Sequence, residues 1–133
     1  MSLILSAVLV VVAAFHLCWS LGVWVPAGDE ARLARAVYGT QGVERMPGPV
    51  ACSLVTVALL FAAAWPWFPD GWLTRLGLVV LTLVFVGRGM VAYTSFWRRL
   101  APTEPFATLD RRFYAPLCLI LGAGFLILTL EAF

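Results

Sequence analysis

Four long apolar segments, separated by short polar stretches, constrain the fold of this chain more than any other feature. They run over about residues 3–25, 47–65, 72–97 and 113–131. Each has roughly the 20 residues that an α-helix needs to cross the ~30 Å hydrocarbon layer of a bilayer. Backbone N–H and C=O groups cannot remain unpaired in lipid, so we expect each of these segments to be an α-helix. We therefore expect an all-α membrane protein, a single domain of four transmembrane helices in an antiparallel bundle.

The composition argues against a soluble domain beside the four spans. Of the 133 residues, 62% are hydrophobic and only 12% are charged, too few to cover a soluble core. The net charge of +2 comes from arginines without any lysine, and their patches are too small for a nucleic-acid surface. We expect membrane lipid as a partner and no nucleic acid.

The arginines are distributed unevenly between the two ends of the predicted bundle. Because basic residues concentrate in cytoplasmic loops, this bias places the loops after the first and third spans in the cytoplasm and both termini outside. Only Arg75 lies on the other side, whereas the two loops contain Arg32, Arg35, Arg45, Arg98, Arg99, Arg111 and Arg112.

A short amphipathic helix is expected in the first of these loops. Asp29 can cap a helix over residues 30–38, and Gly39 can end it. Its arginines lie on or near one face and its apolar residues on another. This helix either rests on anionic headgroups or simply connects two spans.

Two ionisable residues lie within the spans at a similar depth. His16 and Arg88 are each about nine residues from the cytoplasmic ends of their spans, or ~13 Å at 1.5 Å per residue. A charge at that depth costs at least ~2.5 kcal/mol, so Arg88 is expected to face the interior or a wet cavity. We expect the two side chains to share one cavity.

The informative question is which group pairs with the Arg88 guanidinium. The spans have no acidic residue near its level, and Glu44 can contribute only if its loop folds back into the bundle. The guanidinium must then find carbonyls, hydroxyls, water or an acidic group supplied by a ligand. A purely structural Arg88, bonded to carbonyls, is the competing interpretation.

The other polar residues of the first span allow several interpretations. His16 can be a hydrogen-bonded neutral side chain, a proton-handling or ligand-binding group, or a metal or haem ligand without a second histidine. Trp19 lies one turn further on the same face and can wall a pocket or pack at a helix interface. Cys18, Cys52 and Cys118 are expected to pack as small apolar residues, so we predict no metal site.

Three motifs resemble an uncharacterised bacterial family, a domain of unknown function with four membrane helices. They are His16-Leu-Cys-Trp19 with Gly22, the Arg-Gly-Met of residues 88–90, and Leu109-Asp110-Arg111-Arg112 followed by Tyr114 and Pro116-Leu-Cys-Leu119. The resemblance covers nearly the whole chain and implies the same fold and a bacterial membrane location. It implies no activity.

The last motif also has a physical interpretation at the start of the fourth span. Asp110 can cap that helix and pair with Arg111, Arg112 or an arginine of the neighbouring loop, or it can contact a headgroup or substrate. Tyr114 is a further candidate ligand-binding residue.

Three functions remain open on the sequence. The first is a bundle that binds an amphipathic or lipid-like molecule, which can be anionic, in the cytoplasmic half of the membrane. Its candidate residues are His16, Trp19, Glu44, Arg88, Asp110 and Tyr114. The second is a structural or accessory subunit, as a homo-oligomer or with a partner membrane protein, and the third is a small transporter. No nucleophile is paired with a base, so neither a reaction nor a cofactor can be named.

Overall fold

The computed structural model describes all 133 residues, and every regular element in it is helical. The four long helices are α1 (Ser2–Ser20), α3 (Pro49–Ala64), α4 (Trp72–Val91) and α7 (Ala115–Ala132). Four segments are long and apolar enough to cross a membrane: Ser2–Ser20, Pro49–Trp67, Trp72–Val91 and Phe106–Ala132. The expected all-α fold with four spans is confirmed, and the chain is a multi-pass membrane protein.

Five shorter elements connect the long helices. They are α2 (Glu30–Val37), the 3₁₀ turn η1 (Trp65–Trp67), α5 (Ser95–Leu100), α6 (Phe106–Leu109) and the π-helical segment η2 (Asp110–Tyr114). The last two continue directly into α7, so α6, η2 and α7 follow one another without a break.

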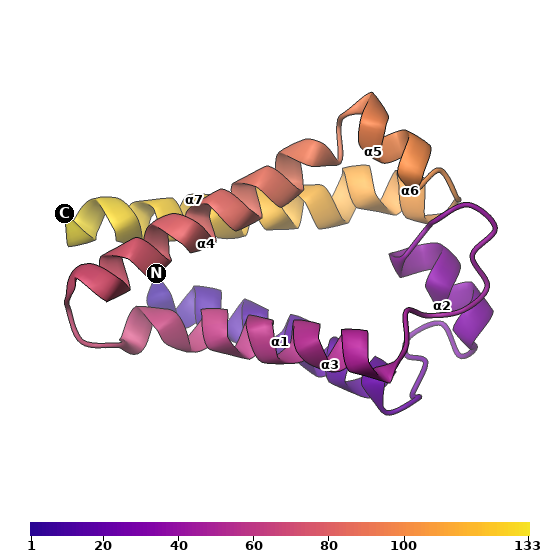
Figure 1. The fold of residues 1–133 in the computed structure, drawn as a ribbon, viewed down its shortest axis with the longest axis horizontal. Helices are drawn as coiled ribbons and strands as arrows, with labels where there is room; N and C mark the ends of the chain where they lie inside the picture. Colours follow the sequence, from indigo (N-terminus) through magenta and orange to yellow (C-terminus); the bar gives the residue numbers. More distant parts are fainter.

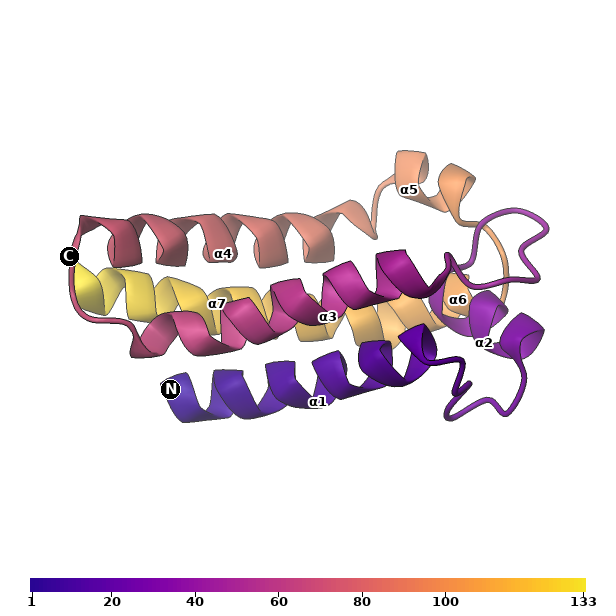
Figure 2. The same cartoon turned by 60° about the horizontal axis from the view of Figure 1, so that its bottom comes forward.

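The long helices form two pairs. α1 packs along α3, and α4 packs along α7, as Figure 1 shows. Both termini and the α3–α4 connection lie at one end, whereas α2, α5 and α6 lie at the other (Figures 1 and 2). The two arginine-containing loops therefore share one end of the bundle, which we call the arginine end.

The two pairs meet in an apolar core. Within the α4–α7 pair, Phe85 stacks on Phe125 with ring centroids 5.5 Å apart, and Phe125 is fully buried. A Cβ on Gly124 would lie 2.6 Å from Leu5 of α1, so the glycine lets α1 and α7 approach closely. The core cluster consists of Leu5, Leu9, Ala62, Ala63, Leu78, Phe85, Leu121 and Phe125.

The predicted helix in the first loop is present as α2. The Asp29 side chain accepts a hydrogen bond from the Arg32 amide at 2.8 Å, and Gly39 follows the helix with a φ of 70°. Leu33 and Ala34 are buried in a second apolar cluster with Met46, so the apolar face of α2 packs on protein. Of the two expected roles, the contacts favour the connector.

The third and fourth long helices have different limits from the predicted spans. α4 ends at Val91, and the Thr94 hydroxyl then accepts a hydrogen bond from the Trp97 amide to begin α5. The fourth span begins at Phe106 in place of residue 113. Side-chain capping thus turns the chain back before Trp97, which places α5 beside the start of the fourth span.

Candidate functional site

A fully buried carboxylate, Asp110, is the centre of the polar site. One of its oxygens accepts a hydrogen bond from Arg88 Nη2 at 2.8 Å. The other accepts from Trp97 Nε1 at 2.8 Å and from Arg98 Nη2. Four side chains from three separate elements, α4, α5 and η2, therefore form one connected cluster, which we call the Asp110 cluster.

The expectation that Arg88 lacks an acidic partner is wrong. The helix containing Asp110 begins at Phe106, inside the predicted loop, and continues through a π-helical turn into α7. Asp110 is therefore buried beside α4 and does not cap a helix at the surface. Its pairing with Arg98 confirms the expected partner from the neighbouring loop, whereas Arg111 and Arg112 form no ion pair with it.

A close approach of two backbones brings Arg88 to Asp110. The next residue, Gly89, is buried, and a Cβ on it would lie 2.6 Å from the Leu119 side chain and 3.0 Å from the Ala115 carbonyl oxygen. Any larger residue would push α4 away from α7 at this level.

Aromatic rings hold both guanidinium groups. Arg88 Cζ lies 5.0 Å from the centroid of the Trp97 ring, and Arg98 Cζ lies 5.7 Å from that of Phe106. Arg98 also donates to the Ala107 carbonyl oxygen at 3.0 Å. Planar guanidinium groups stack on rings while their N–H groups bond sideways, so each arginine is fixed in orientation.

The cluster contains more positive than negative charge. Two arginines contact one carboxylate, so an ionised Asp110 leaves one positive charge in excess. Arg88 Nη1 and Arg98 Nε are buried and have no hydrogen-bond partner. The Arg88 side chain is nevertheless 33% exposed, so the site is not sealed. Such an arrangement can accept a further anionic or hydrogen-bond-accepting group.

Tyr114 joins the fourth span to the first loop. Its hydroxyl donates to the Ala36 carbonyl oxygen at 2.9 Å, and the centroid of its ring lies 6.0 Å from that of the Phe106 ring. The Thr103 hydroxyl likewise donates to the Thr40 carbonyl oxygen at 2.8 Å. These contacts hold α2 against α6, the helix that precedes Asp110.

The other predicted site residues lie outside the Asp110 cluster. His16 Nδ1 is 2.9 Å from the Val12 carbonyl oxygen, and its ring centroid is 4.7 Å from that of Trp19, as their shared face predicts. No hydrogen bond joins His16 to Arg88, so their common cavity stays a prediction. Glu44 is exposed and forms no ion pair, and its loop does not bring it to Arg88.

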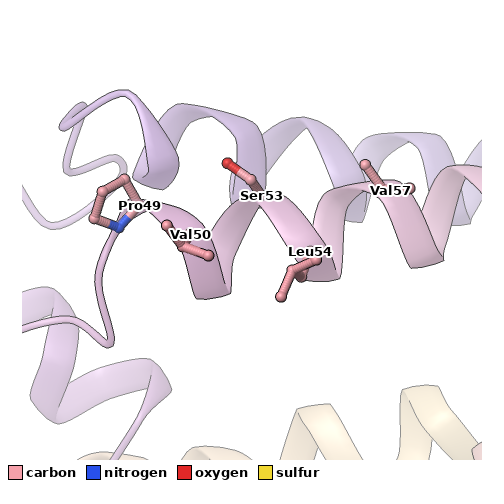
Figure 3. A pocket seen from close by; sticks show the side chains of 5 residues that line it. All are labelled: Pro49, Val50, Ser53, Leu54 and Val57. Atoms are coloured by element: carbon pink, nitrogen blue, oxygen red, sulfur yellow. The ribbon is translucent and has the colours of Figure 1, made fainter.

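A shallow apolar groove of about 290 Å³ lies on the arginine-end half of α3. Figure 3 shows Val50 and Leu54 projecting from this helix on one side, with Ser53 on the other. Ser53 supplies the hydroxyl in a lining of Pro49, Val50, Ser53, Leu54 and Val57. This apolar surface suits an acyl chain or another apolar segment.

Sequence reasoning missed Trp97 as a site residue and placed Arg98 only in a loop. A Trp-Arg-Arg run directly after an apolar span was the available signal, but it is equally typical of an interfacial anchor. The decisive feature, the turn before α5, depends on the Thr94 cap.

The fold and site define a class: a four-helix integral membrane protein with two arginines paired to one buried aspartate near one end. The chain belongs to the family described as Protein of unknown function (DUF3995), which matches residues 9–125. This confirms the expected membership of an uncharacterised family. The comparisons found no match among the curated proteins and none among the solved structures.

Proposed function

We propose that this bundle binds an anionic, amphipathic small molecule at the Asp110 cluster, with the acidic head bonded to Arg88 and Arg98. One observation carries the proposal: two guanidinium groups share a single carboxylate, and Arg88 Nη1 and Arg98 Nε have no partner. Leaving a buried donor unpaired costs about 1–3 kcal/mol, so an anionic oxygen at this place would be stabilising.

The surroundings explain why the molecule would be amphipathic. The cluster joins α4 to the start of the fourth span, so its neighbours on both sides are apolar membrane helices. An acidic head can reach the arginines while an apolar tail stays among helices or in lipid. The groove on α3 offers such a tail an apolar wall at the same end of the bundle.

A structural or accessory role is the second candidate, and the Asp110 cluster itself favours it. Arg88 already has a carboxylate partner, so the cluster can hold α4, α5 and η2 together without a ligand. A transporter has no comparable observation in its favour.

Two substitutions distinguish the candidates, because the ligand proposal predicts changes in the bound molecule and the accessory role predicts none. Arg88→Gln removes a positive charge and should reduce retention of the bound anion about ten-fold or more, because a charge-assisted hydrogen bond contributes about 1.5–3 kcal/mol. Asp110→Asn removes the competing carboxylate and should preserve or increase retention. Native mass spectrometry of the purified proteins measures the co-purifying adducts directly.

Arg75→Gln is the matched control, since Arg75 lies near the opposite end of the bundle over the Phe133 ring. It should keep the wild-type adducts. If wild type, Arg88→Gln and Asp110→Asn carry identical adducts while both cluster variants are less stable, the ligand proposal is overturned and the accessory role stands.

We further infer that the protein resides in a bacterial cytoplasmic membrane with its arginine end in the cytoplasm, because the arginine bias supports that orientation. Single cysteines at residues 69–71, in a background without the native cysteines, should react with a membrane-impermeant reagent in intact cells. Cysteines at residues 101–103 should react only after permeabilisation. The reverse pattern would invert the topology.

A further inference from the structure

Helix α5 presents two faces of different character. Its inner face contributes Trp97 and Arg98, which both bond to Asp110. Its outer face carries Phe96 and Leu100, which are 64% and 51% exposed, together with the exposed Arg99. Residues 96, 99 and 100 are three and four positions apart, so they share one side of the helix.

Further exposed apolar and basic residues lie on the elements next to α5. The Tyr93 hydroxyl donates to the Arg111 carbonyl oxygen at 2.9 Å, which fixes the end of α4 beside η2. Tyr93 and Phe113 are both largely exposed, as is Arg112. We call the exposed set of Tyr93, Phe96, Arg99, Leu100, Arg112 and Phe113 the α5 outer surface.

Charge and depth both restrict what can cover this surface. Arg99 and Arg112 form no ion pair, and none of the six residues is acidic. α4 has 20 residues, which at 1.5 Å each extend ~30 Å and fill the hydrocarbon layer. α5 begins four residues after α4 ends, so it lies at the boundary between acyl chains and headgroups.

We propose that the α5 outer surface binds anionic phospholipids of the adjacent leaflet. Phe96 and Leu100 insert among the upper acyl chains, while Arg99 and Arg112 contact lipid phosphates. A helix of six residues is marginal by itself, so lipid contacts on the outer face stabilise α5. The inner-face residues Trp97 and Arg98 are thereby held on Asp110. This inference does not depend on an anion at the Asp110 cluster.

Hydrogen exchange of the α5 amides tests this inference. The probes are bilayer nanodiscs of phosphatidylcholine alone and of phosphatidylcholine with phosphatidylglycerol. Exchange over residues 95–100 should be about five-fold slower or more in the anionic bilayer, because each basic residue near such a surface contributes ~1 kcal/mol. Amides of the α1–α3 pair should exchange equally in both.

Two variants make the test specific. Arg99→Gln combined with Arg112→Gln should abolish the difference between the bilayers, whereas Arg45→Gln, an exposed arginine of the first loop, should retain it. Arg88→Gln should retain it too, which separates this surface from the Asp110 cluster. Equal exchange in both bilayers, or a difference that survives the double substitution, would overturn the inference. Full protection by inorganic phosphate in neutral nanodiscs would also overturn it, by assigning the arginines to a free anion.

Discussion

Asp110→Asn is expected to lower the free energy of unfolding by about 3–5 kcal/mol, because it leaves two partly buried guanidinium groups without their counter-charge. Arg88→Gln and Arg98→Gln should each lower the free energy of unfolding by less, since each variant keeps one complete arginine–aspartate pair. Reversible unfolding in detergent micelles, followed by the loss of helical circular dichroism, measures these differences.

Glu131→Gln provides the control, because Glu131 is exposed and forms no ion pair. Its effect should stay within about 0.5 kcal/mol. In the Asp110→Asn background, Arg88→Gln should cost less than it does in the wild type, since it then removes an uncompensated charge. An Asp110→Asn protein as stable as Glu131→Gln would mean that the Asp110 cluster does not form.

Gly39→Ala should also be strongly destabilising, by about 2–5 kcal/mol, for two reasons that add. The backbone φ of 70° strains any residue with a Cβ, and this Cβ would lie 2.1 Å from the Phe106 ring. Phe106 belongs to α6 and lies beneath Arg98, so its displacement disturbs the Asp110 cluster as well. Thermal unfolding of the purified variant, compared with the wild type, measures this loss of stability.

Gly42→Ala separates the two causes. Gly42 has a φ of 68°, but a Cβ added to it would have no atom within 4 Å, so only the backbone strain of about 1–2 kcal/mol applies. Gly39→Ala should therefore be clearly the less stable of the two. Equal losses would show that Phe106 does not pack on Gly39.

The fold could be predicted because lipid restricts it so strongly. The number of spans follows from segment length and hydropathy, and the α2 helix follows from the Asp29 cap and the Gly39 stop. These signals are local, and each rests on a few neighbouring residues. The arrangement of the helices as two close pairs depends on side-chain packing and was not predictable in that way.

The site was only partly predictable, for the same reason. Burial in apolar surroundings marked Arg88 as a residue that needs a partner, and Asp110 was a candidate in its own right. Their contact depends on a cap at Thr94 and a π-helical turn at Asp110, which together change where two spans begin and end. Tertiary contacts decide such boundaries, so depth counted along the sequence placed Asp110 too far from Arg88.

The most direct test of the central claim is an experimental structure of the protein in a lipid bilayer, resolved well enough to show headgroup density at the Asp110 cluster. The proposal predicts non-protein density with an acidic group about 3 Å from Arg88 Nη1 or Arg98 Nε, while Asp110 keeps its bonds to both arginines. A cluster in which both nitrogens bond only to protein carbonyls, side chains or water, with no such density, would contradict it.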